Sequence, residues 1–225
     1  MKASEYDYTE RPKLFDKNDF WRQVRRTIKG KPVDETQINL IVKQICTILS
    51  LNQNDHLLDL GCGNGALTTR LSPYVSKIHG VDMSDYLIGI ANEYFCSRKL
   101  TFETNTISVI MNQKGFKPYE KCLLYGVSSF LEDDLLEKLV SKFFEGNGKS
   151  ILLGNVRDKM FAKDFYGDNF SQNSLDDITS SMGKWRSMKW FSQIAKNGNF
   201  NVSFHKMNKD FYATQYYFDV LFQKN

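Results

Sequence analysis

Short apolar segments alternate with amphipathic stretches along most of this chain. From Ile38 to Leu49 apolar residues recur every three or four positions, and Asp34 followed by Gln37 resembles a capping box, so we expect a core-facing helix there. Strands separated by helical patterns indicate a parallel sheet with helices on both faces. Five segments have the composition of short buried or alternating strands: 56–60, 77–82, 100–104, 121–127 and 150–156.

The remaining segments complete this pattern. Helices are expected between the strands at residues 66–71, 84–96 and 135–144, with Ser84 as an N-cap and Pro73 as a stop. Two β-rich segments, 200–207 and 216–222, end the chain and are expected to pair antiparallel. The predicted fold is therefore α/β: a doubly wound, mostly parallel seven-stranded sheet with an antiparallel C-terminal hairpin and helices on both faces.

The pattern divides the chain into a main domain and two less regular segments. Residues 34–225 hold the strands and helices, and residues 1–33 are expected to form an N-terminal helical lid or appendage. Within the main domain, the segment at about 157–189 is too long for a simple connection and is rich in polar and aromatic residues. Loops of this length with aromatic side chains are typical of lids or binding segments.

Composition and charge narrow the class of protein. The 225 residues carry a net charge of +4 and are 41% hydrophobic and 14% aromatic, which excludes a disordered tail or a disulfide mini-protein. No apolar run approaches the roughly 18 residues of a membrane helix, and the polar start of the chain lacks a secretory signal, so we expect a cytoplasmic protein without a membrane partner. The four cysteines form no C-x-x-C pair and predict neither a metal cluster nor a disulfide framework.

The segment from Asp59 to Ala66 carries the clearest chemical signal. Glycines at positions 61, 63 and 65 follow a predicted strand and open a predicted helix, where they let the backbone turn sharply and a ligand come close. The N–H groups that open the helix can receive a carboxylate or phosphate. Asp82 lies 23 residues beyond Asp59, at the end of the next predicted strand, where a carboxylate can accept hydrogen bonds from ribose hydroxyls. Together these features predict a nucleoside-binding pocket.

Two other interpretations of this turn are open. A glycine-rich turn that serves packing alone is the plain alternative, and the strand, the helix and Asp82 weigh against it. Gly61, Gly63 and Ala66 also satisfy the G-x-G-x-x-G/A dinucleotide pattern, so an NAD-dependent oxidoreductase is a rival function.

The glycine segment also resembles a family motif. Residues 59–65, with the sequence DLGCGNG, are similar to motif I of the class I, Rossmann-like, S-adenosylmethionine-dependent methyltransferases, and residues 81–84, VDMS, are similar to their acidic motif at the second strand. The resemblance extends more loosely from about residue 34 to the end, because that family closes its sheet with an antiparallel hairpin. It implies methyl transfer from S-adenosyl-L-methionine.

The resemblance implies a set of cofactor-binding residues. The backbone at Gly61 and Gly63 would pass beside the cofactor, Asp59 would face its aminoacyl end and Asp82 would hold the ribose diol. The family commonly has an acid where this chain has Asn105, so recognition of the adenine amino group stays open. The other expected residues follow the turn and the ends of the next three strands: Cys62, Asn64, Gly65, Met83, Thr104, Gly126 and Val127.

No general base stands out in the sequence. Methyl transfer is an in-line displacement, in which alignment contributes up to about 7–11 kcal/mol and a positioned base adds roughly 10²–10⁴-fold. Asp158 follows the fifth predicted strand and is the best catalytic candidate, while the alternative is that it caps a helix or pairs with Arg157. The three histidines, at positions 56, 79 and 205, are expected to be structural.

Candidate substrate-binding residues come from basic and aromatic segments. Arg25 and Arg26 belong to a run of five cations, at positions 22, 25, 26, 29 and 31, without an acid among them. This run is either the solvated face of a helix or a lid whose arginines meet an anionic substrate. Arg157 and Trp185 are further candidates, although in the favoured alternative Trp185 anchors the insertion on the core.

Missing motifs argue against several acceptors. The chain has no Pro-Pro or Pro-Cys pair, no clustered acids after the fourth and fifth strands, and no paired-glutamate loop directly after the fourth strand, so DNA, catechol-type and protein-arginine acceptors are not expected. We expect a hydroxyl or amine of a small anionic metabolite: a sugar, a nucleotide-linked sugar or a phosphate-bearing compound, with no metal. RNA is a less favoured acceptor, a homodimer stays open, and a catalytically silent methyltransferase-like partner subunit is a third alternative.

Overall fold

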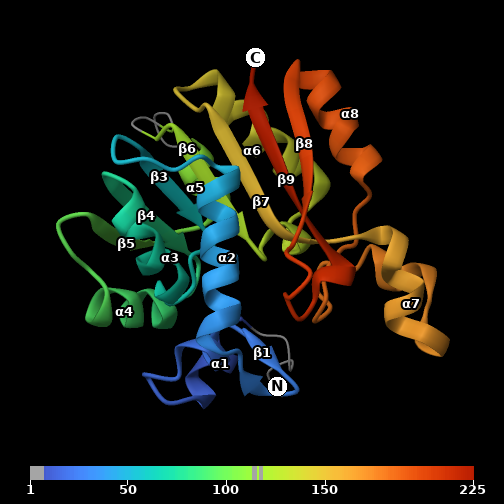
Figure 1. Cartoon of the computed structure of the whole chain (residues 1–225), viewed down its shortest axis with the longest axis horizontal. Coiled ribbons are helices and arrows are strands. Elements are labelled where there is room, and N and C mark those ends of the chain that lie inside the picture. The colour runs from blue at the N-terminus through green and yellow to red at the C-terminus, as the bar shows by residue number, and fades with distance from the viewer. Residues whose placement is uncertain (1–7, 113–115, 117–118) are drawn as a thin grey trace.

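The computed structural model describes residues 8–112, 116 and 119–225. A seven-stranded sheet in the order β5-β4-β3-β6-β7-β9-β8 forms its centre (Figure 1). The five strands from β5 to β7 in this order are parallel, and β9 runs antiparallel to both β7 and β8, which confirms the predicted fold class. The strands are β3 (His56–Leu60), β4 (Lys77–Asp82), β5 (Leu100–Thr104), β6 (Lys121–Tyr125), β7 (Ser150–Arg157), β8 (Phe200–Lys206) and β9 (Tyr217–Lys224).

Helices cover both faces of this sheet. On one face lie α2 (Glu35–Ile48), α3 (Ala66–Leu71) and α4 (Asp85–Tyr94), and on the other α5 (Ile107–Asn112), α6 (Asp133–Glu145) and α8 (Met188–Gly198). Neighbouring residues on a strand point to opposite faces, so Leu57 of β3 packs in the core under α2, α3 and α4, while Leu58 packs in the core under α5, α6 and α8. A strand that is buried on both faces has a continuous run of apolar residues, as β6 does.

The predicted helix caps are present. The side chain of Asp34 accepts a hydrogen bond from the N–H of Gln37 at 3.0 Å, and Ser84 caps α4 through the N–H of Leu87. Helix α4 ends at Tyr94, two residues before the predicted end. None of the helices in the described part of the chain is long and apolar enough to cross a bilayer.

The described part of the N-terminal segment is only partly helical. It contains a 3-10 turn, η1 (Arg11–Leu14), the single-turn helix α1 (Phe20–Gln23) and a two-stranded antiparallel ribbon of β1 (Thr27–Ile28) and β2 (Lys31–Pro32). Arg25 and Lys29 adopt positive φ, at 57° and 50°, which no helix accommodates. The basic run therefore forms a bend and a ribbon, and not the face of one helix.

The insertion after β7 folds into short helical turns around a small core. These turns are η4 (Lys159–Phe161), α7 (Ala162–Tyr166), η5 (Gly167–Asn169) and η6 (Gln172–Leu175). Trp185 is fully buried against Ala162 and Leu175, and its Nε1 donates to the hydroxyl of Tyr166 at 3.3 Å. Trp185 thus anchors the insertion, as in the alternative that the sequence favours.

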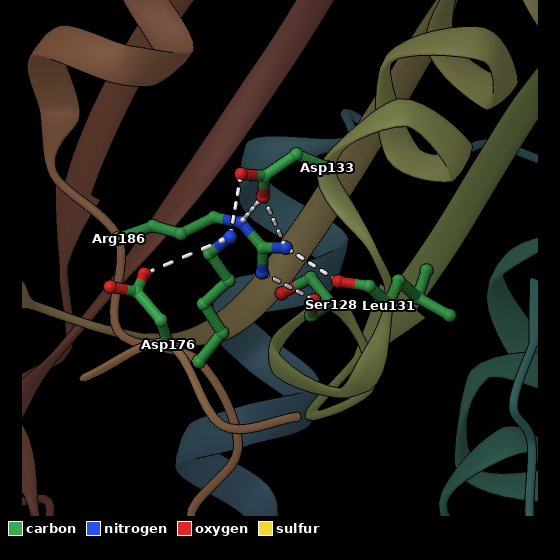
Figure 2. A network of polar contacts seen from close by, with 6 residues as sticks. Ser128, Leu131, Asp133, Asp176 and Arg186 are labelled. Atoms are coloured by element: carbon green, nitrogen blue, oxygen red, sulfur yellow. Dashed lines mark hydrogen bonds and ion pairs between the residues drawn. The ribbon is translucent and has the colours of Figure 1, made fainter. Parts of the chain in front are cut away.

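A polar network ties the same insertion to the loop after β6. Arg186 donates from Nε and Nη2 to Asp133, at 3.1 and 2.9 Å, and from its two terminal nitrogens to the carbonyls of Ser128 and Leu131 at 2.6 Å each (Figure 2). Lys184 binds the other oxygen of Asp133 at 2.6 Å. Phe130 and Leu131 of this loop line a cavity, so the network fixes one wall of that cavity.

Candidate functional site

A cavity of about 570 Å³ lies at the carboxyl edge of the parallel strands. Its lining comes from the turn after β3, from the ends of β4, β5, β6 and β7, and from the N-terminal segment around residues 21–27. Carboxyl edges of open α/β sheets are the usual place for ligands. The volume lies within the range of roughly 300–1,000 Å³ that is typical of small-molecule sites.

The glycine turn makes close approach possible at one end of this cavity. Gly61, Gly63 and Gly65 adopt φ values of +76°, +57° and +76°, in the left-handed region that other residues enter only with strain. A Cβ atom at Gly63 would meet the side chain of Val24 at 2.8 Å, and one at Gly61 would collide with Val127. Glycine is therefore required at both positions by the backbone conformation and by the packing of Val24 and Val127, and close approach of a ligand stays a prediction.

Asp82 lies at the same turn and is already fixed by the backbone. Its two carboxylate oxygens accept hydrogen bonds from the N–H groups of Gly63 and Ser84, both at 2.9 Å. Burial raises the pKa of Asp82, and these backbone donors oppose the rise. The N–H of Met83 also lowers this pKa, and because a carboxylate has about four acceptor positions, Asp82 still has capacity for a further donor. The arrangement fits a pair of neighbouring hydroxyl groups.

Asp59 is the second carboxylate at this end of the cavity. It is buried, and its Oδ2 accepts a hydrogen bond from the hydroxyl of Thr68 at 2.6 Å. Burial raises the pKa of Asp59 to about 7; the Thr68 hydrogen bond lowers it and the nearby charge of Asp82 raises it further. Thr68, in α3, is a site residue that the sequence analysis missed, because nothing in the pattern links it to β3.

Asn64 connects the glycine turn to the N-terminal segment. Its side-chain amide donates to the carbonyl of Phe20 and to Oε1 of Gln23, both at 2.8 Å, and its Oδ1 accepts from the N–H of Ala66. Gln23 is buried and in turn donates to backbone carbonyls of residues 16 and 17. The expected cofactor residue Asn64 therefore holds the segment over the site, and Gln23 is a partner that the sequence analysis missed.

The other expected cofactor residues divide by position. Asn105 lines the cavity, and its side chain is fixed between Glu103, to which it donates at 2.8 Å, and the N–H of Thr106. Gly65 and Thr104 do not line it; Gly65 instead packs against the ring of Phe102. The remaining expected residues that border the cavity are Cys62, Met83, Gly126 and Val127.

The cavity lining also includes basic and aromatic residues. Arg25, Arg26 and Arg157 line it, as do the rings of five aromatic residues. Arg26 lies 4.8 Å over the ring of Tyr125, and Arg157 lies 5.2 Å from the ring centre of Phe130. The sequence analysis missed all five of these rings, although Tyr125 lies within the fourth predicted strand. The five residues are Tyr8, Tyr125, Phe130, Tyr212 and Tyr217.

Asp158 and Trp185 do not line the cavity. Asp158 caps η4 through the N–H of Met160, at 3.1 Å, and forms an ion pair with Lys206 at 2.9 Å. Its side chain is buried away from the site, so its position argues against a role as general base. The structure thus matches the capping alternative, with Lys206 and not Arg157 as the ionic partner.

The fold and the site indicate a class of protein, and comparison with known proteins indicates the family within that class. The sheet order, the glycine turn and the acidic residue at the end of β4 are those of a Rossmann-like nucleoside-binding domain. Residues 57–145 match the family model described as a methyltransferase domain. The resemblance to class I, Rossmann-like, S-adenosylmethionine-dependent methyltransferases is thereby confirmed.

Solved structures with the same fold include several methyltransferases. The magnesium protoporphyrin IX methyltransferase of Synechocystis PCC 6803, solved with bound S-adenosylhomocysteine, is 16% identical, covers 97% of this chain and 100% of its own, and has a TM-score of 0.63. An S-adenosylmethionine-dependent methyltransferase of Clostridium acetobutylicum is 16% identical over 92% and 98% of the two chains, with a TM-score of 0.67. S-adenosylmethionine, the cofactor that the sequence predicts, is thus the ligand found, as itself or as S-adenosylhomocysteine, in solved structures with this fold.

Curated relatives match over shorter stretches. The ribosomal RNA small subunit methyltransferase A of Prochlorococcus marinus is 39% identical over 56 residues, which are 24% of this chain and 20% of that protein. The sterol 4-C-methyltransferase of Caenorhabditis elegans is 23% identical over 119 residues, or 52% and 36% of the two chains. The chain thus spans about a fifth of the length of the first of these relatives, whose acceptor differs from that of the second.

Proposed function

We propose that this chain transfers a methyl group from S-adenosyl-L-methionine to a hydroxyl or amine of a small anionic metabolite. The observation that supports it is the charge distribution along a single cavity, with Asp82 at the end of β4 and Arg157 at the end of β7, two strands that β3 and β6 separate in the sheet. The acidic end suits a cationic sulfonium nucleoside, and the basic end suits an anionic acceptor. From the sequence we expect a sugar, a nucleotide-linked sugar or a phosphate-bearing compound.

The residues at the acidic end fit this cofactor. The backbone at Gly61 and Gly63 would pass beside it, the free acceptor positions of Asp82 suit the two ribose hydroxyls, and Asp59 suits the ammonium of the aminoacyl end. Met83 and Asn105 would flank the adenine, and residues 126–127 would lie near the sulfonium. When bound, the cofactor supplies a methyl group activated by the positive sulfur.

Alignment is the main contribution that this chain can make to catalysis. Burial raises the pKa of Tyr125 far above neutrality, so its hydroxyl stays protonated and can donate a hydrogen bond but cannot act as a base. Because Asp158 is outside the cavity lining and is bound to Lys206, we expect the acceptor to lose its proton to water or to its own neighbouring groups. Holding acceptor and methyl group in line is worth up to about 7–11 kcal/mol and suffices as a mechanism.

Two alternative functions are less well supported. An NAD-binding protein would place pyrophosphate on the N–H groups that open α3, yet Asp82 already accepts from Gly63 and Asn64 from Ala66. An RNA acceptor is suggested by the relative that methylates ribosomal RNA, but a cavity closed over by the N-terminal segment favours a compact substrate. The silent-subunit alternative has no structural observation in its favour.

Two measurements test the proposal. Isothermal titration should show binding of S-adenosylhomocysteine and no binding of NAD, whereas the opposite result would make the chain an oxidoreductase. Incubation with a metabolite extract and isotope-labelled S-adenosylmethionine should then label a small molecule. Label that enters only ribosomal RNA in a parallel reaction would move the acceptor to RNA, and absence of label in any acceptor would favour the silent subunit.

A further inference from the structure

Arg157 is a buried cation without a counter-ion in the described part of the chain. Its side chain lines the cavity and lies 5.2 and 6.0 Å from the ring centres of Phe130 and Tyr217. Its Nε and Nη1 atoms are buried and have no hydrogen-bond acceptor, and no described carboxylate forms an ion pair with it. By contrast Arg186, equally buried, binds Asp133 and two carbonyls (Figure 2).

Burying the charged guanidinium of Arg157 without a counter-ion is unfavourable for folding. Removing a guanidinium from water without a partner carries a penalty of several kcal/mol, which folded proteins normally offset with an anion or with hydrogen bonds. Burial accordingly lowers the pKa of Arg157, and the nearby charge of Arg25 lowers it as well. A negatively charged group bound in the cavity would supply both the missing charge and the missing acceptors.

The surroundings of Arg157 restrict the shape of that group. Aromatic rings lie beside the guanidinium, so the donors available to a ligand are those in its plane. A carboxylate is planar and meets two such donors at once. Beyond Arg157 the wall is aromatic, and a further unpartnered donor is the buried hydroxyl of Tyr125.

Size restricts the ligand further. The cavity of about 570 Å³ must hold the cofactor as well as the acceptor, so a nucleotide-linked sugar is too large for the remaining space. Arg25, Arg26 and Arg157 all line the cavity, so the acceptor that binds there is expected to be an anion. Size therefore argues against the nucleotide-linked sugar among the acceptors that the sequence predicts.

We propose that the acceptor is a compact aromatic acid, whose carboxylate binds the in-plane donors of Arg157 and whose ring packs among the aromatic side chains around it. The proposal rests on the proposed function, because it names the acceptor of the same site. It assigns Arg157 as the specificity-determining residue and Tyr125 as a hydrogen-bond donor to the polar substituent of the ring.

The test uses benzoate as the probe, with benzamide as its neutral counterpart and phenyl phosphate as the dianionic one. Each is titrated into the full chain saturated with S-adenosylhomocysteine. Benzoate should bind at least tenfold more tightly than either of the others. Arg157→Gln should abolish this preference, and Arg70→Gln, which removes an exposed arginine paired with Glu35, should retain it.

The outcomes separate this proposal from the proposed function. If S-adenosylhomocysteine binds but benzoate is no better than benzamide, the aromatic-acid proposal is overturned and the methyltransferase assignment stands. Tighter binding of phenyl phosphate would overturn it in favour of a phosphate acceptor. If S-adenosylhomocysteine does not bind, the proposed function itself fails. Should Arg157→Gln not fold, the comparison of the three probes on the unaltered chain still decides.

Discussion

At the scale of single residues, the two carboxylates of the acidic end have different tasks. Asp82 is held by two backbone N–H groups and keeps free acceptor positions, so it is built to bind. Asp59 is more deeply buried, and within the described part of the chain its carboxylate accepts a side-chain hydrogen bond from Thr68 alone, so its charge is poorly compensated in the free protein. Sequence spacing predicted both positions, but their distinct environments depend on Thr68 and on the turn, which only the folded chain brings together.

The first prediction concerns Asp82. Asp82→Asn should weaken binding of S-adenosylhomocysteine at least tenfold, because a charge-assisted hydrogen bond to a ribose hydroxyl is worth roughly 1.5–3 kcal/mol. Isothermal titration measures the effect. Asp85→Asn is the matched control, since this exposed carboxylate at the start of α4 lies three residues away and should leave the affinity unchanged. Equal affinities in all three proteins would mean that Asp82 does not face the ligand.

The second prediction follows from the pKa of Asp59, which burial raises from 3.8 to about 7. The folded protein then binds this proton more tightly than the unfolded chain does, so the associated stability is complete below pH 3.8 and is lost as the pH rises through about 7. Asp59→Asn carries no titrating group. Its free energy of unfolding in urea should therefore fall less than that of the unaltered chain between about pH 5 and pH 8. If the free energies of unfolding of the two proteins change equally with pH, the raised pKa of Asp59 is contradicted.

At the scale of elements, local periodicity accounts for most of what the sequence predicts. The helices α2, α4 and α6 have apolar residues at helical spacing, and central strands such as β6 are short continuous apolar runs; both patterns are kept in the fold because these residues pack in the two cores. The N-terminal ribbon could not be predicted this way. It depends on positive φ at Arg25 and Lys29, and on the distant contact from Asn64, and neither leaves a periodic trace.

The third prediction concerns the contact between α1 and the glycine turn. Asn64→Ala removes the donors to Phe20 and Gln23 and leaves the buried amide of Gln23 without this partner. Amide hydrogen exchange of residues 16–26 should become faster, while that of β7 stays unchanged. Asn54→Ala, at an exposed turn before β3, serves as the control. Unchanged exchange in residues 16–26 would show that other contacts hold the segment.

The fourth prediction concerns the insertion and the loop after β6. Arg186→Met should lower the free energy of unfolding by about 3 kcal/mol, since it removes the donor to one oxygen of Asp133 and to two loop carbonyls, while Lys184 keeps the other oxygen of Asp133. Urea unfolding measures the change. Lys189→Met, an exposed cation in the first turn of α8, should cost far less. A cost equal to that of the control would mean that the network does not hold the wall of the cavity.

At the scale of the whole molecule, charge is arranged along one cavity although the net charge of +4 is small. The carboxylates that close the turn after β3 and the arginines from the N-terminal segment and the end of β7 meet there, from parts of the chain more than 100 residues apart. The cofactor end could be predicted because its glycines and acids are local in sequence. The acceptor end could not, because its rings come from residue 8 and from the segments 125–130 and 212–217, which lie far apart in the sequence.

The central claim is that the cavity holds an adenosyl sulfonium whose ribose is bound by Asp82. A crystal structure of the full chain with S-adenosylhomocysteine tests it most directly. We expect both ribose hydroxyls within hydrogen-bonding distance of the Asp82 carboxylate, the amino end beside Asp59, and the sulfur facing residues 126–127 and the space in front of Arg157. A ligand bound at another surface, or a ribose turned away from Asp82, would contradict the claim.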